Sequence, residues 1–141
     1  AAPEPTVPVF ALLVGLCDDA SRLVYAAVEC RGEGEEVPVP ADLAAPLALL
    51  VAETAASVFI SARPTHPNAT PAARFTTSRD GDTTRLSLTV TGVGAGRHLP
   101  EHAPVVAALA GQLRATVETV PGDDSVVCTI SLETPSDVPF P

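Results

Sequence analysis

The chain has 141 residues and a formal net charge of −9, with 46% hydrophobic but only 4% aromatic residues. A chain of this length forms one domain with a sizeable core, here made of valine, leucine and alanine. The negative charge argues against nucleic-acid backbones and anionic membranes as partners, because both would repel it. The chain contains no methionine, so we expect it to be a piece of a longer protein.

The first third of the chain predicts a loose N-terminal segment, followed by a helix and a strand. Residues 1–8 are rich in proline and are expected to form a loose N-terminal segment. Residues 9–20 place apolar side chains on one helical face and predict a short helix. Residues 23–30 alternate and predict a strand, and the acidic, glycine-containing residues 32–36 predict a turn.

Residues 42–62 predict the central helix of the core. The apolar positions recur at three- and four-residue steps and include Leu47, Leu50, Val51, Thr54, Val58 and Ala62. This is the period of a helix with one buried stripe. Asp42 is expected to cap the first turn, and Arg63 and Pro64 to end the helix. The apolar part is shorter than the roughly 20 residues that span a bilayer, so we interpret it as a core helix.

The second half predicts two hairpins separated by a third helix. Residues 73–78 and 84–91 form strands around a turn at Asp80 and Gly81, with Leu86, Leu88 and Val90 inward. Residues 101–114 predict a helix whose packed face carries Val105, Leu109, Gln112 and Leu113. Strands are expected at 115–120 and 125–132, and residues 134–141 form a proline-rich tail.

This order of elements predicts an α+β fold over residues 9–133. We expect a two-layer sandwich with one five-stranded, mixed sheet and about three helices on one of its faces.

Two groups of side chains could suggest a metal site or a catalytic site, but we interpret neither group in this way. Cys17, Cys30 and Cys128 lie far apart in the sequence with no metal-ligand spacing, so we expect buried, reduced thiols. His66, His98 and His102 lie in polar or proline-rich segments, where histidine is usually solvated. We therefore predict no metal site and no catalytic residue.

Part of the central helix resembles a known motif. Residues 46–62 resemble the N-box helix of sensor histidine kinases, in the subgroup whose motif runs P-L-x-L-x-x-N-E-L-x-x-N-A-x-K-H-A. The matching positions are Pro46, Leu47, Leu49, Glu53 and Ala62. The two asparagines of the motif fall on Ala52 and Ser57, and its lysine–histidine pair falls on Ile60 and Ser61.

A second match follows at the end of a predicted strand. The family motif D-x-G-x-G corresponds to Val90-Thr91-Gly92-Val93-Gly94, so both glycines match and the aspartate does not. With the order of elements, this extends the resemblance over nearly the whole domain. It implies the Bergerat-type ATP-binding fold shared by histidine kinases, type II topoisomerases, a heat-shock chaperone and mismatch-repair ATPases.

The departures from the family all fall on nucleotide contacts. The resemblance implies that Glu53, Ser57, Val90, Gly92 and Gly94 mark the vestigial nucleotide positions. The family aspartate accepts a hydrogen bond from the adenine amino group, and Val90 offers no acceptor. Ser57 replaces the asparagine that binds Mg²⁺ and is a poorer ligand for it. Within residues 95–106, where the family has a glycine-rich phosphate lid, only Gly96 remains, and Glu101 brings negative charge.

These departures predict a degenerate domain without ATP, Mg²⁺ or another cofactor. The resemblance places it in the cytoplasm, at the C-terminal end of a sensor histidine kinase or related two-component signalling protein. Its partners would be other domains of that protein and a response regulator, with any oligomer formed through the parent. The alternatives are an active kinase domain with substituted site residues, the vestigial domain of a histidine phosphotransferase, or an unrelated α+β interaction domain.

Overall fold

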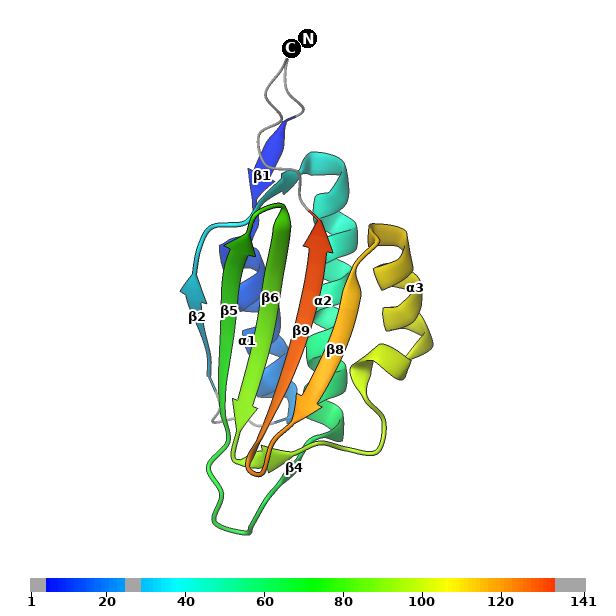
Figure 1. Ribbon diagram of the computed structural model, residues 1–141. Helices are drawn as coiled ribbons and strands as arrows, with labels where there is room; N and C mark the ends of the chain where they lie inside the picture. Colours follow the sequence, from blue (N-terminus) through cyan, green and yellow to red (C-terminus); the bar gives the residue numbers. More distant parts are fainter. Residues whose placement is uncertain (1–4, 25–28, 134–141) are drawn as a thin grey trace.

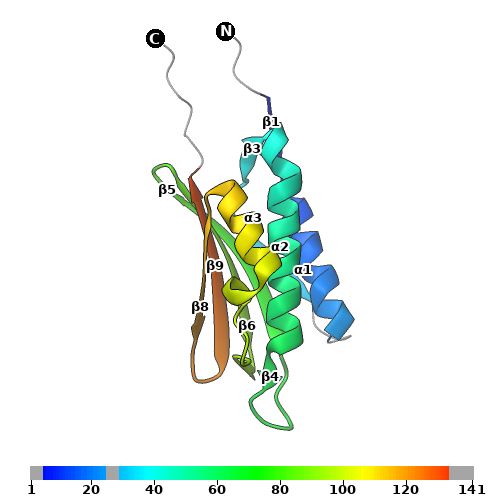
Figure 2. The same cartoon turned by 90° about the vertical axis from the view of Figure 1, so that its right-hand side faces the viewer.

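A five-stranded sheet forms one layer of the protein, and three helices pack on one of its faces (Figures 1 and 2). The structure is a computed structural model, and it describes residues 5–24 and 29–133. The strand order is β2-β5-β6-β9-β8, with β2 parallel to β5 and the other neighbours antiparallel. The strands of this sheet are β2 (Cys30–Gly34), β5 (Ala72–Asp80), β6 (Thr83–Thr91), β8 (Thr116–Pro121) and β9 (Ser125–Glu133). The predicted two-layer α+β sandwich is confirmed.

Helix α2 (Ala41–Ser61) is the centre of the helical layer and packs on both α1 (Phe10–Val24) and α3 (Pro104–Leu113). The predicted inward stripe is confirmed, because all six of its side chains are buried. The predicted cap is wrong. The N-cap position is Pro40 and no side chain caps the helix, so Asp42 lies in the first turn as an acidic residue near the positive end.

The strand predicted at 23–30 is also wrong in position. Leu23 and Val24 form the last turn of α1, residues 25–28 lie outside the described part, and β2 begins only at Cys30. Leu23 is 86% exposed, so its place in an apolar run does not reflect burial. Part of the predicted turn at 32–36 belongs to β2 instead. Gly34 fits there because a Cβ would come within 2.3 Å of the Thr77 carbonyl oxygen.

The leading segment takes part in the fold from Thr6 onward. Strand β1 (Thr6–Pro8) pairs antiparallel with β3 (Pro38–Pro40), so both proline-rich segments are extended and hydrogen-bonded next to the start of α2. The remaining parts of the two expected terminal segments, residues 1–4 and 134–141, lie outside the described residues.

Both predicted hairpins are confirmed, whereas the third helix differs. Residues 100–102 form a 3-10 turn (Pro100–His102), and α3 starts only at Pro104 because a residue before proline is forced out of the helical conformation. The packed face is confirmed only in part. Leu109 and Leu113 are partly buried against the core, whereas Val105 is 54% exposed and Gln112 is exposed. The buried side chains of α3 are Val106 and Ala110.

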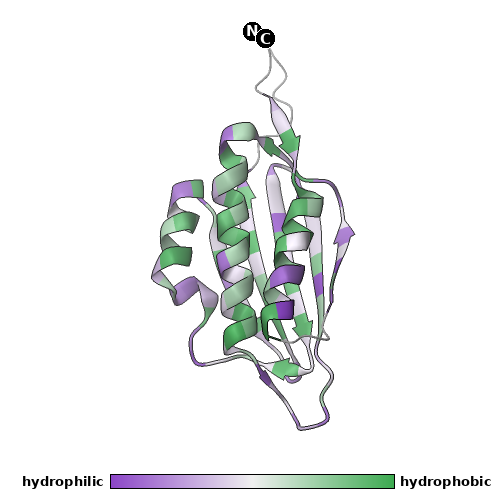
Figure 3. Cartoon of the chain, turned by 180° about the vertical axis from the view of Figure 1, so that it is seen from behind, coloured by the Kyte–Doolittle hydropathy of each residue, from purple (hydrophilic) through white to green (hydrophobic). Residues whose placement is uncertain are grey.

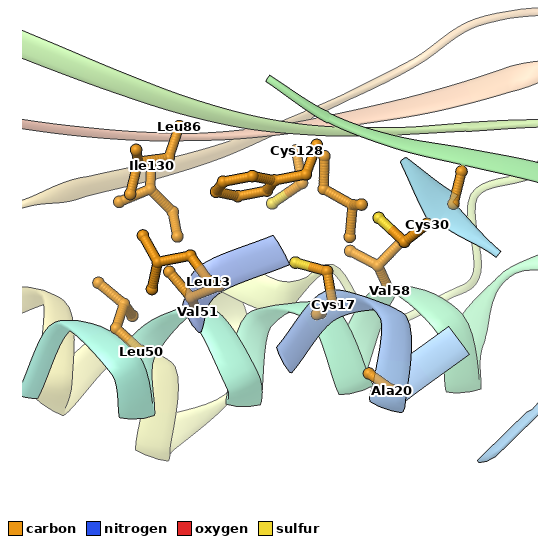
Figure 4. Close-up of a cluster of buried hydrophobic side chains, with 14 of the residues drawn as sticks. Leu13, Cys17, Ala20, Cys30, Leu50, Val51, Val58, Leu86, Cys128 and Ile130 are labelled. Atoms are coloured by element: carbon orange, nitrogen blue, oxygen red, sulfur yellow. The ribbon is translucent and has the colours of Figure 1, made fainter. Parts of the chain in front are cut away.

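The core fills the space between helices and sheet (Figure 4). Cys17, Cys30 and Cys128 are buried and free, as predicted. A hydrogen bond with Cys30 and burial raise the pKa of the Cys17 thiol, and burial raises the pKa of Cys128 to about 11. The Cys17 and Cys128 thiols are therefore not nucleophiles at neutral pH. The hydrogen bond with Cys17 lowers the pKa of the Cys30 thiol instead.

By length and composition, α2 is also apolar enough to cross a membrane, and it is the one such helix in the described part of the chain. In this structure its inward stripe packs against the sheet, as in a core helix of a globular domain.

Candidate functional site

The site that the two sequence motifs predict lies where the carboxyl end of α2 meets the end of β6. Ser57 is half-buried and lines an open hollow of about 730 Å³. The other residues around this hollow are Ile60, Ser61, Arg63, Ala95, Gly96, Arg97 and His98. Glu53 is exposed one turn earlier on α2 and is not part of the lining. The structure therefore brings Ser57 to the candidate site and leaves Glu53 at its margin.

Val90 is fully buried at the end of β6, with Ala73 and Val126 beside it on the neighbouring strands. It continues the inward row of Leu86 and Leu88, as predicted. A polar group placed against Val90 would contact an apolar side chain, which offers no hydrogen-bond acceptor.

Gly92 makes the sharp turn that follows β6. Its φ is 78°, in the left-handed region that glycine tolerates best, and its N–H donates to the Asp124 carbonyl oxygen at 2.8 Å. A Cβ there would lie 3.0 Å from the Thr70 carbonyl oxygen.

Gly94 is different, although it belongs to the same motif. It lies in the short strand β7 (Val93–Gly94), which pairs with β4 (Arg63–Pro64) directly after α2. Its φ is not positive, and a Cβ would meet the Thr65 side chain only at 4.0 Å. The backbone therefore requires glycine at Gly92 and not at Gly94.

The segment that follows β7 packs directly on the end of α2. At Gly96 a Cβ would come within 2.3 Å of the Ser61 carbonyl oxygen, so the two backbones are in close contact. Beneath this contact remains a cavity of about 10 Å³, lined by residues of α2, of this segment and of the sheet edge. That is about the space one water molecule needs, so a nucleobase does not fit there.

Glu101 fixes the same segment to the sheet. Its Oε1 accepts a hydrogen bond from Thr119 Oγ1 at 2.6 Å, and its Oε2 accepts one from the Thr119 backbone N–H at 2.9 Å. Burial alone would raise the pKa of Glu101, but the hydrogen bonds from Thr119 outweigh it and lower the pKa. The carboxylate is therefore ionised at neutral pH and holds the 3-10 turn against the edge strand β8.

The open hollow beside Ser57 is lined by basic side chains. Arg63 donates through Nη1 to the carbonyl oxygens of Ile60 and Ala62, at 2.8 and 3.0 Å, which satisfies the end of α2. Arg97 and His98 are exposed on the opposite rim. Among the described residues, no group of three histidine, cysteine or acidic side chains could hold a metal ion.

Sequence reasoning missed two features of this site. Ser61 and Gly96 form its closest contact, and Thr119 anchors Glu101, yet these pairs are distant in the sequence and belong to no motif. The lone glycine left in the predicted lid was a signal for the first contact. Nothing in the sequence marks Thr119.

No known protein-family profile matches the chain, and no curated protein matches its sequence. Solved structures do match its fold. The blue-light activated histidine kinase EL346 of Erythrobacter litoralis superposes with a TM-score of 0.74 and 18% identity, over 90% of this chain and 42% of that protein. The histidine kinase AdeS of Acinetobacter baumannii gives 0.68 and 14%, over 96% of this chain and 70% of that one. The mycobacterial sensor histidine kinase MprB gives 0.67 and 13%, over 95% of this chain and 100% of that one.

The chain thus spans less than half of the EL346 protein and 65% of a structure of the EL346 histidine kinase domain. In each of these three structures the superposition covers 90% or more of this chain. The chain has a histidine-kinase-type ATPase fold.

Proposed function

We propose that this chain is a kinase-like domain that no longer binds ATP and that acts in docking or regulation within a longer two-component signalling protein. The observation that carries the proposal is the contact of Gly96 with the end of α2, which leaves a cavity of about 10 Å³ beside the sheet. In the family fold, the nucleotide base would lie against the position that Val90 occupies here. The space for the base is therefore what we propose this chain has lost.

Three further features support loss of nucleotide binding. Val90 is buried among apolar side chains and cannot pair with an adenine amino group. Ser57 offers a short hydroxyl where the family has a magnesium ligand. Glu101 is ionised and engaged with Thr119, so opening this segment would break two hydrogen bonds to a carboxylate.

A domain that keeps this fold without its ligand retains surfaces that other proteins can recognise. Its partners would be other domains of the parent protein and a response regulator in the cytoplasm. A vestigial domain of a histidine phosphotransferase would use the fold in the same way.

The competing function is an active kinase domain that binds ATP through substituted residues. One observation favours it. The hollow beside Ser57 has room for a ligand, and Arg63 and Arg97 on its rim could attract phosphate groups.

Thermal unfolding with and without nucleotide separates these functions. A ligand present at 100 times its dissociation constant stabilises the folded state by about 2.7 kcal/mol, which raises the melting temperature by several degrees. We expect no rise with about 5 mM ATP or ADP and Mg²⁺. The same concentration of GTP with Mg²⁺ controls for unspecific anion effects. A rise with the adenine nucleotides alone would support the active kinase.

A further inference from the structure

The outward face of α2 is apolar along its length. The side chains that face away from the sheet recur at three- and four-residue steps and are Ala45, Leu49, Ala52, Ala56 and Ile60. We call them the outer stripe. Leu49 is 56% exposed and Ile60 is 63% exposed. In Figure 3, which shows the protein from behind, the ribbon of α2 has hydrophobic colours along most of its length.

Neighbouring helices extend this apolar surface. Leu12 on α1 and Val105 on α3 are also about half exposed, on either side of α2. The 21 residues of α2 include two charged side chains, Asp42 and Glu53. An exposed apolar surface of this extent usually marks an interface.

The outer stripe is complementary to a second copy of itself. When a second α2 is laid antiparallel on the first, with a twofold axis between Ala52 and Glu53, Leu49 comes opposite Ala56 of the other copy. In the same register Ile60 comes opposite Ala45. Each bulky side chain therefore faces an alanine of the other copy, and each contact occurs twice, as a twofold interface requires.

The same register also pairs opposite charges. Arg63 lies just beyond the end of α2, in β4, and its side chain folds back onto the Ile60 carbonyl oxygen, so its guanidinium comes near Asp42 of the other copy at both ends of the paired helices. Both residues are exposed, and the hydrogen bond from Arg63 to the Ile60 carbonyl oxygen places the guanidinium next to the outer stripe. Nη1 makes this bond, and a guanidinium has further N–H donors for a carboxylate. A single twofold axis therefore aligns the apolar side chains with alanines and also the acidic side chains with basic ones.

The area of the helical face agrees with this pairing. At 1.5 Å per residue, the 21 residues of α2 are about 30 Å long. Helices α1 and α3 have 15 and 10 residues, so they are about 22 and 15 Å long. With axes about 8–10 Å apart, the three helices present a face of roughly 600–700 Å². A stable complex buries ~800 Å² on each partner, so this face suits a dimer of modest affinity.

We propose that two copies of this chain form a symmetric dimer through antiparallel α2 helices, with Leu49 against Ala56 and Asp42 against Arg63 across the interface. The proposal goes beyond the proposed function and does not depend on it, because it makes no use of the nucleotide site. The two Glu53 side chains lie on the same side near the axis, and their repulsion limits the affinity.

Sedimentation velocity of the 141-residue chain over a wide concentration range tests the dimer. We expect a monomer–dimer equilibrium that Leu49→Glu abolishes. Leu49 is half exposed, so this variant should keep its melting temperature, and Leu23→Glu on the far end of α1 is the matched control that should still dimerise. A chain that stays monomeric would leave the face for another part of the parent protein and would overturn the proposal.

A charge exchange tests the register. Asp42→Arg and Arg63→Asp should each weaken the dimer at least about fivefold, and the double variant should recover most of that loss. Glu118→Arg makes the same change of charge on the outer face of the sheet and should have no effect. A dimer whose affinity falls further in the double variant would contradict the antiparallel register.

Discussion

Glu101 clamps the 3-10 turn after β7 to the edge strand β8 through two hydrogen bonds from Thr119, one from its hydroxyl and one from its backbone N–H. This clamp and the contact of Gly96 with Ser61 hold one segment at both of its ends. Under the function that we propose, this segment would cover the place of the nucleotide base. The two contacts fix the segment against α2 and against β8.

Glu101→Gln should lower the free energy of unfolding by about 1–2 kcal/mol at pH 6, because two hydrogen bonds lose their charged acceptor. The hydrogen bonds lower the pKa of the folded carboxyl. Their contribution is then present above the unfolded pKa of about 4.3 and is lost as the pH falls through the folded pKa. The difference between wild type and variant should shrink from pH 6 to pH 3 in urea denaturation.

Glu118→Gln is the matched control for this experiment. Glu118 precedes Thr119 on β8 and is exposed on the other face of the sheet. If the two glutamine variants had equal stability and equal pH dependence, the clamp would contribute nothing.

Val90→Asp should lower the free energy of unfolding by at least about 2 kcal/mol at pH 7.5, because it buries a carboxylate without a partner. Burial raises the folded pKa of such a group, so protonation at pH 5 should recover part of the loss. Thr91→Asp, at the next and exposed position, should be far milder. Urea denaturation at both pH values measures this. Equal stability of wild type and Val90→Asp would mean that the space beneath β6 is open and polar.

Gly92→Ala and Gly94→Ala should differ, although both glycines belong to the same sequence motif. Gly92 has a φ of 78° and a carbonyl oxygen 3.0 Å from the added Cβ, so its substitution should cost about 1 kcal/mol or more. Gly94 has neither constraint, and its substitution should cost less. Equal melting temperatures of the two variants would show that the turn at Gly92 is not strained by a side chain.

Thr54→Val should leave the protein as stable as the wild type or stabilise it by up to about 1 kcal/mol. Thr54 is buried in α2, and its Oγ1 has no hydrogen-bond partner among residues 5–24 and 29–133. Thr77→Val is the opposite case, because Thr77 Oγ1 donates to the Glu35 carbonyl oxygen, and it should destabilise by about 1 kcal/mol. Chemical denaturation of both variants measures the difference. Destabilisation of equal size in both would show that Thr54 also has a partner, such as a buried water.

The sequence predicted most of the core because its signals there are local. The stripe of α2 and the alternation of β6 and β9 follow directly from helical and strand periods, and all these side chains are buried. The prediction failed where the pattern is ambiguous. Helix α3 is rich in alanine, so its periodicity barely distinguishes Val105 from Val106. Residues 23–30 alternate like a strand, but α1 continues through Val24, and both Leu23 and Val24 are exposed there.

The sequence predicts which elements carry the candidate site, but not the contacts that fix the segment after β7. The glycine motif and the N-box-like helix placed Ser57, Val90 and Gly92 in one region, because each follows a recognisable element. The contacts that close the region join residues far apart in the chain, such as Glu101 with Thr119. No spacing rule connects such pairs in a single sequence.

Isothermal titration calorimetry of the 141-residue chain with ATP and with ADP, in the presence of Mg²⁺, tests the central claim most directly. We predict no binding heat for either nucleotide up to millimolar concentration, because Val90 offers no acceptor and the cavity beneath Gly96, of about 10 Å³, is too small for a base. A dissociation constant below about 100 μM, which corresponds to roughly −5.5 kcal/mol, would contradict the account of a closed, nucleotide-free domain.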